Sequence, residues 1–185
     1  MATLITFETG SRFIESRRQL ECKFHLSLLS ENEYIIGQRM LLFLHWPWWQ
    51  KPLVFENGRP LPAELAVLGR CLQEGEEGVW LNSRSTVSGV VDLQEIEPGK
   101  FKTMRQPRPT FVQLCLQAFY ALPDVSKGIY DLVLWRESDQ RVRFIEVKCP
   151  HWDSVTNEQR RFADLAAERG IGAEVVEWEF AEATE

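Results

Sequence analysis

Three ionisable residues in the C-terminal third of the chain, Asp131, Glu146 and Lys148, have types and a spacing suited to hydrolytic chemistry. Glu146 and Lys148 lie two positions apart in the β-rich run 142–148, so their side chains project from the same face of a strand. The run 130–135 is also β-rich, and the polar segment between the two runs predicts a hairpin. In an antiparallel hairpin, Asp131 near the start of one strand lies close to Glu146 and Lys148 near the end of the other.

This group of charges predicts a metal-dependent reaction on a phosphodiester. Two carboxylates a few ångströms apart repel each other unless a cation lies between them, and hard oxygen ligands suit Mg²⁺ or Mn²⁺. Such an ion would polarise a phosphate and lower the pKa of a water molecule, while Lys148 orients the water or stabilises the developing charge. The alternative interpretation is an exposed strand end with an incidental ion pair, which would add little to stability.

The residues around this group resemble a known nuclease signature. The stretch Gly128-Ile-Tyr-Asp-Leu-Val-Leu-Trp135, followed by Phe144-Ile-Glu-Val-Lys-Cys-Pro150, resembles the PD-(D/E)XK motif, with Tyr130-Asp131 where Pro-Asp is usual. It is similar above all to the VRR-NUC branch, in which a polar loop and a helix carrying a glutamine follow the lysine. A bare Glu-x-Lys is weak evidence, but this ordered series up to Phe180 is much harder to obtain by chance.

The resemblance implies an α/β fold with a restriction-endonuclease-like core, a small mixed β-sheet flanked by helices, and hydrolysis of DNA with Mg²⁺ or Mn²⁺. It also implies that Asp131 and Glu146 are metal ligands, that the Val147 carbonyl adds a third oxygen, and that Lys148 serves the attacking water. Gln159 would line the site. Its spacing from the preceding threonine also matches a capping box at a helix start, and the two roles can coexist.

One acidic residue that the family usually carries is missing from its expected place. Family members have it on a helix upstream of the metal-binding aspartate, but the helix expected over 110–122 offers only Gln113 and Gln117. Glu21, on an amphipathic helix expected near the N-terminus, is the first candidate to replace it and Glu15 the second, unless both are surface charges. Without this carboxylate, the chain would be a degenerate nuclease-fold module that binds nucleic acid or protein without catalysis.

A basic stretch over 99–109 stands out in a chain whose net charge is −6. That net charge argues against a protein that coats nucleic acid nonspecifically, but a local basic patch can still contact phosphates. The stretch has no acidic residue, and its four cations are predicted to contact phosphates: Lys100, Lys102, Arg105 and Arg108. The alternative is a solvated loop.

The length of 185 residues fits one compact domain, with 1–109 as an N-terminal elaboration and 110–185 as the nuclease core. The aromatic run 45–49 is expected to pack in the core, or to form the binding surface of an interaction protein. The remaining sequence predicts helices over 14–29, 63–73, 110–122 and 156–169, the third of them capped by Thr110. It also predicts a strand or hairpin over 79–96 and a strand over 174–180.

The rest of the composition indicates the protein's setting. No apolar run reaches the roughly 20 residues that cross a bilayer, and the four cysteines are not spaced for a disulfide framework or a zinc site. We therefore expect a cytoplasmic protein with no membrane partner. Its expected partner is DNA, branched or single-stranded, and the resemblance suggests a homodimer.

Overall fold

The computed structural model describes residues 3–7, 53–56, 59–73, 76–82, 84–97, 100–149 and 154–180. The chain forms two compact units: the first contains residues 1–5, 64–92 and 104–179, and the second contains 6–63, 93–103 and 180–185. The helix expected over 14–29, with Glu15 and Glu21, and the aromatic run 45–49 lie outside the described residues.

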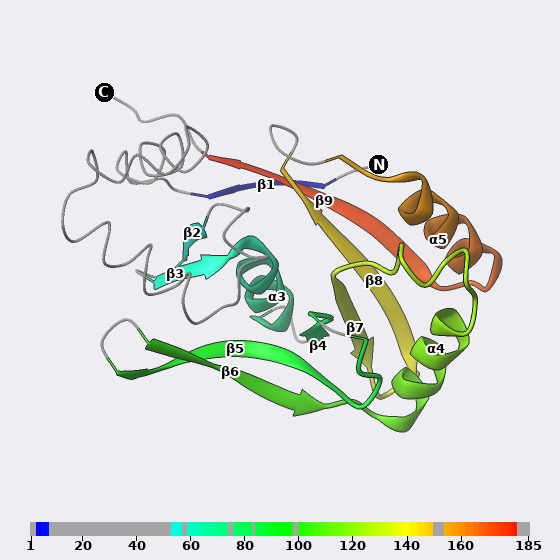
Figure 1. The fold of residues 1–185 in the computed structure, drawn as a ribbon, viewed down its shortest axis with the longest axis horizontal. Coiled ribbons are helices and arrows are strands. Elements are labelled where there is room, and N and C mark those ends of the chain that lie inside the picture. The colour runs from blue at the N-terminus through cyan, green and yellow to red at the C-terminus, as the bar shows by residue number, and fades with distance from the viewer. Residues whose placement is uncertain are drawn as a thin grey trace. The chain divides into compact units, whose positions relative to one another are not determined.

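The main sheet of the described residues has seven strands in the order β1-β9-β8-β7-β4-β5-β6 (Figure 1). Strands β7 and β8 form the predicted antiparallel hairpin, whereas β8 and β9 run parallel, so the sheet is mixed. Two neighbouring parallel strands must be joined by a crossover connection, which the helix between β8 and β9 provides. The bounds of the strands are β1 Thr3–Phe7, β4 Glu77–Trp80, β5 Ser88–Glu97, β6 Lys100–Pro107, β7 Leu132–Arg136, β8 Arg141–Lys148 and β9 Gly172–Phe180.

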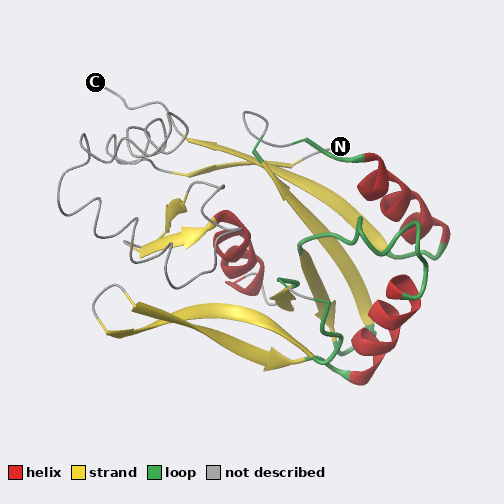
Figure 2. Cartoon of the chain, viewed as in Figure 1, coloured by secondary structure: helices red, strands yellow, loops and turns green. Residues whose placement is uncertain are grey.

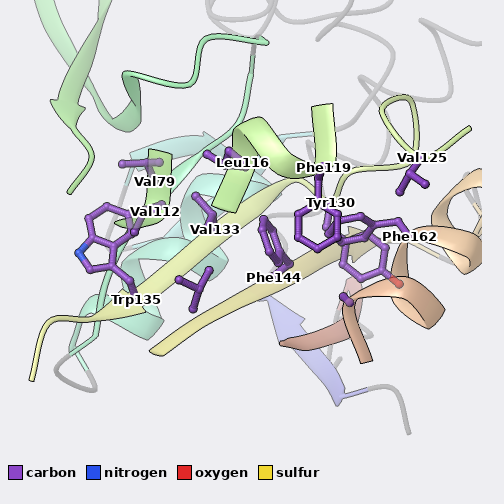
Figure 3. Packing of buried hydrophobic residues seen from close by; sticks show 12 residues of the cluster. Val79, Val112, Leu116, Phe119, Val125, Tyr130, Val133, Trp135, Phe144 and Phe162 are labelled. Carbon is purple, nitrogen blue, oxygen red and sulfur yellow. The ribbon is translucent and has the colours of Figure 1, made fainter. Parts of the chain in front are cut away.

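Two helices, α4 (Thr110–Tyr120) and α5 (Asn157–Glu168), cover one face of this sheet (Figure 2). Their aromatic side chains meet those of β8 in a buried cluster, in which the rings of Phe144 and Phe162 are 5.0 Å apart and those of Phe119 and Phe144 are 5.7 Å apart (Figure 3). Edge-to-face aromatic pairs of this kind add to the free energy gained by burial. This packing fixes α5 over β8.

The third described helix, α3 (Ala63–Gln73), packs on the opposite face. A Cβ atom at Gly78 of β4 would lie 2.3 Å from Leu134 Cδ2 and 3.1 Å from Leu68 Cδ1. Because neighbouring residues alternate between faces, these leucines lie opposite the aromatic cluster. With helices on both sides, β7 is buried on both faces, which explains its apolar run Leu132–Trp135.

Most expected elements are present, and two details differ. Strands β4 and β5 pair antiparallel, as the hairpin interpretation expected, but the basic stretch 99–109 is mainly strand β6 and not a loop. Helix α4 begins at Thr110 but is not capped by it, because Pro109 occupies the cap position and no side chain accepts a capping hydrogen bond. Main-sheet strands β4, β5 and β6 all come from the segment before Pro109.

The second unit contains a small antiparallel pair, β2 (Leu53–Glu56) and β3 (Arg59–Pro62), with Leu53 opposite Pro62. None of the described helices is long and apolar enough to cross a membrane.

Candidate active site

The register of the β7–β8 hairpin brings Asp131 beside Glu146. Leu132 pairs with Ile145, so Asp131, one residue earlier, lies next to Glu146 on the neighbouring strand. The Asp131 backbone N–H donates to Glu146 Oε2 at 3.2 Å, and the Val147 backbone N–H donates to Asp131 Oδ2 at 3.1 Å. Each carboxylate thus accepts a hydrogen bond from a backbone amide across the hairpin. The closeness of the two residues is as the sequence predicted.

Lys148 completes the group. Its Nζ lies 2.8 Å from Glu146 Oε1, and the two side chains are only 7% and 2% exposed. Burying a charged group is costly unless the group is paired and hydrogen-bonded. The alternative interpretation was therefore wrong in expecting an exposed strand end.

Gln159 joins the site from the first turn of α5, and it combines both roles considered for it. Its backbone N–H donates to Thr156 Oγ1 at 3.2 Å, and its Oε1 accepts from the Thr156 backbone N–H at 2.9 Å, which is a capping box. Its Nε2 donates to Glu146 Oε1. Because Oε1 faces an N–H donor and Nε2 faces a carboxylate, both contacts favour the same orientation of the amide.

Gly128 explains how the first turn of α5 comes so close to the hairpin. A Cβ atom at this position would lie 2.2 Å from the Glu158 carbonyl oxygen and 2.7 Å from the Gln159 nitrogen. Any side chain larger than hydrogen would push the helix start, and with it the Gln159 amide, away. The resemblance included Gly128 in its motif, but sequence reasoning gave it no role.

Tyr130 lines the same region from the buried side. Its ring lies 5.0 Å from that of Phe162 and is 2% exposed. Burial raises the pKa of the Tyr130 hydroxyl, and the nearby negative charge of Glu146 raises it further. The hydroxyl therefore stays protonated at neutral pH and adds no further negative charge beside Glu146 and Asp131.

The basic residues predicted to contact phosphates have different environments. Lys102 and Arg105 are exposed, and only the backbone of Lys100 is described. Arg108 does not fit the prediction: it is 3% exposed, and its Nη1 and Nη2 donate to the carbonyls of Ser85 at 2.6 Å and Ser88 at 2.5 Å. Burial lowers the pKa of Arg108 to about 10, so it is still charged at neutral pH but not available to a phosphate.

The donors present fit a hard divalent cation. Asp131 and Glu146 supply carboxylate oxygens on adjacent strands, the ligand type that Mg²⁺ and Mn²⁺ prefer. The described residues hold no group of three or more His, Cys, Asp or Glu side chains that could together hold a metal ion. Within this part of the chain, further ligands would have to be backbone oxygens such as the Val147 carbonyl, or water. Glu21 and Glu15 remain predictions.

Comparison with known proteins identifies the family. A family model described as the VRR-NUC domain matches residues 78–178, more than half of the chain. The chain belongs to the VRR-NUC family. Residues 78–178 are therefore a nuclease-type domain, and the mixed sheet with flanking helices is the restriction-endonuclease-like fold that the resemblance implied.

Two similar solved structures are crystal structures of paFAN1, one bound to 2nt 5' flap DNA with gap and the other bound to 1nt 5' flap DNA with gap. The first is 23% identical over 39% of this chain and 14% of the paFAN1 chain, with a TM-score of 0.33. The second is 26% identical over 37% and 13%, with a TM-score of 0.31. The similarity thus spans a small part of the paFAN1 chain. No curated protein matches this chain significantly.

Proposed function

We propose that the protein is a divalent-metal-dependent nuclease that hydrolyses DNA phosphodiester bonds through Asp131, Glu146 and Lys148. The observation that carries the proposal is the buried Glu146 carboxylate, which accepts hydrogen bonds from the Asp131 backbone and Gln159 and forms an ion pair with Lys148. Structural ion pairs are usually placed where water can solvate them, whereas this one is withdrawn from water beside a second carboxylate. Membership of a nuclease family supports the same conclusion.

The two carboxylates would hold the metal ion, with the Val147 carbonyl as a further ligand. When bound, Mg²⁺ or Mn²⁺ would polarise the phosphate and lower the pKa of a water molecule. Two backbone amides orient the carboxylates before substrate arrives. The Asp131 N–H donates to the Glu146 carboxylate, and the Val147 N–H donates to the Asp131 carboxylate. Such preorganisation lowers the energy needed to assemble the site during the reaction.

Lys148 would orient the attacking water and stabilise negative charge on the phosphate. Its ammonium is held 2.8 Å from Glu146 Oε1, so its position is fixed relative to the proposed metal ligand. Gln159 would keep the Glu146 carboxylate in its rotamer, because it donates to the same oxygen from the rigid first turn of α5. Glu21, or else Glu15, is our proposal for an additional acidic residue.

The test is cleavage of flap, single-stranded and plasmid DNA with Mg²⁺, Mn²⁺ or EDTA. We expect the wild type to cut with either metal and not with EDTA. Asp131→Asn and Glu146→Gln should lower the rate by about 100-fold or more, as for loss of other transition-state stabilising groups. The matched control is Glu76→Gln, which removes one carboxylate from an ion pair with Arg143 elsewhere on the sheet.

Two results would overturn the proposal. If wild type, Asp131→Asn and Glu146→Gln cut at the same rate, the assigned residues are wrong. If the pure protein shifts DNA mobility with either metal but never shortens the DNA, the chain is a binding module that keeps the nuclease fold.

A further inference from the structure

The C-terminal end of strand β4 lies directly beside Asp131, a proposed metal ligand. The Leu81 backbone N–H donates to the Asp131 carbonyl oxygen at 2.7 Å, which extends the β4–β7 pairing by one step. Asn82 follows, and its Oδ1 accepts a hydrogen bond of 3.1 Å from Arg105 Nη2 of β6. An exposed guanidinium is therefore tied to the residue next to this contact. A neutral amide orients the guanidinium without cancelling its charge.

The buried Arg108 side chain holds the bend over residues 84–87. The Arg108 guanidinium donates to the carbonyls of Ser85 and Ser88, and its backbone N–H donates to the Val87 carbonyl at 2.9 Å. The Ser88 backbone N–H also donates to Ser85 Oγ at 3.5 Å. The exposed Arg84 directly precedes this anchored segment, so its side chain extends from a fixed base.

Three arginine charges gather around this bend. Burial lowers the pKa of Arg108, and the positive charge of Arg105 lowers it further. Burial raises the pKa of Tyr120, and the nearby charges of Arg108 and Arg84 act against that rise. Like charges held together repel, and an anion bound between them relieves that repulsion. In a chain of net charge −6, such a local concentration of arginine is typical of a surface that binds a polyanion.

We propose that Arg84 and Arg105 bind backbone phosphates of the DNA strand that is cut at Asp131, Glu146 and Lys148. This inference rests on the proposed function and names the surface from which the substrate enters. Both side chains are exposed, and a guanidinium can donate two parallel hydrogen bonds to one phosphate. Arg108 is a positioning residue in this arrangement, because it holds the bend and does not reach the DNA.

The experiment measures DNA binding without cleavage. Binding of a fluorescently labelled single-stranded 20-nucleotide DNA probe is followed by anisotropy in EDTA over a series of salt concentrations. The variants are the double substitution Arg84→Gln/Arg105→Gln and the charge-retaining Arg84→Lys/Arg105→Lys. The control is Arg136→Gln/Arg141→Gln, which removes two exposed arginines at the β7–β8 turn, the other end of the hairpin.

We expect the Gln double variant to bind at least about tenfold more weakly. The slope of log K against the logarithm of the salt concentration should become shallower by about 0.7 for each phosphate contact removed. The Lys variant should keep the wild-type salt dependence, and the control should keep wild-type affinity within about twofold. A circular dichroism spectrum that matches the wild type will show that the Gln double variant is folded. The single variants Arg84→Gln and Arg105→Gln provide a second measurement, because each should lose part of the affinity.

The inference is overturned if the Gln double variant binds as the wild type does, if the control loses equal affinity, or if the wild type does not bind the probe. Failure of the proposed function looks different. In that case no DNA is shortened with Mg²⁺ or Mn²⁺, although binding in EDTA still depends on Arg84 and Arg105.

Discussion

Two charged clusters of the same formal composition lie on strand β8, toward opposite ends and on opposite faces. Near its start, Arg143 Nε donates to Glu76 Oε1 at 2.9 Å, and the same guanidinium also pairs with Glu174 of β9. Near its end, Lys148 pairs with Glu146 beside Asp131. Each cluster has two carboxylates and one cation, so charge count alone does not distinguish them.

Their exposure and their donors do distinguish them. The side chains of Arg143, Glu76 and Glu174 are 24%, 19% and 38% exposed, and one planar guanidinium satisfies both carboxylates. The hydrogen bond with Glu76 raises the pKa of Arg143 despite its partial burial. Glu146 and Lys148, by contrast, are 2% and 7% exposed, and the cation is a single ammonium. The Arg143 cluster is therefore expected to be structural, and the Lys148 cluster to be functional.

Removing the cation should produce the largest difference between the two clusters, and that difference is in the cleavage rate. We expect Lys148→Met to lower the single-turnover cleavage rate with Mn²⁺ by about 100- to 1,000-fold, because it removes charge stabilisation from the transition state. Arg143→Met should change this rate by less than about threefold, since it lies on the other face of β8. Equal losses in the two variants would remove the distinction.

Loss of a carboxylate should separate the clusters by stability. Glu146→Ala removes the carboxylate that pairs with the buried Lys148 at 2.8 Å and is expected to lower the free energy of unfolding by about 3–5 kcal/mol. Glu76→Ala leaves Arg143 paired with Glu174 and partly solvated, so we expect about 1–2 kcal/mol. Urea denaturation of both variants measures the difference. The opposite ranking would show that Glu146 is not the more strongly coupled carboxylate.

The packing that places α5 over the Lys148 cluster can be tested at Gly128. Gly128→Ala brings a Cβ atom within 2.2 Å of the Glu158 carbonyl, so we expect a loss of about 1–3 kcal/mol in stability and slower cleavage as Gln159 moves. Gly69→Ala in α3 is the control, because nothing lies within 4 Å of its Cβ and alanine favours a helix. That variant should be neutral or slightly more stable. Destabilisation of both proteins to the same extent would contradict the contact.

The smallest effect concerns the capping box of α5. Thr156→Ala removes the acceptor of the Gln159 backbone N–H and should lower stability by about 1 kcal/mol. The Gln159 side chain can still donate to Glu146, so cleavage should fall much less than in Gln159→Ala. Thermal unfolding and cleavage rates of the two variants check this. Equal cleavage by both would assign Gln159 to capping alone.

Local patterns in the sequence predicted how Asp131, Glu146 and Lys148 lie relative to one another. Alternation along β8 placed Glu146 and Lys148 on one face, and the hairpin register placed Asp131 beside them. The capping-box spacing likewise predicted both the start of α5 and the position of Gln159. These features depend on residues a few positions apart or on one tight turn, so single-sequence reasoning can find them.

Features that depend on distant packing were not predictable. Arg108, which directly follows β6, is buried against the segment from Ser85 to Ser88, and composition alone made it look like a phosphate ligand. The partners of Arg143 come from positions 76 and 174, which no local pattern connects. The role of Gly128 depends on a contact with α5, some 30 residues later in the chain.

The most direct test of the central claim is Mn²⁺ binding to the protein without DNA, measured by electron paramagnetic resonance of the free ion. We predict that the wild type binds Mn²⁺ and that Asp131→Asn and Glu146→Gln each weaken binding by about tenfold or more. Glu76→Gln and Glu174→Gln, which alter the Arg143 cluster, should bind as the wild type does. Wild-type Mn²⁺ affinity in Asp131→Asn and Glu146→Gln would contradict the claim that these two carboxylates share a metal ion.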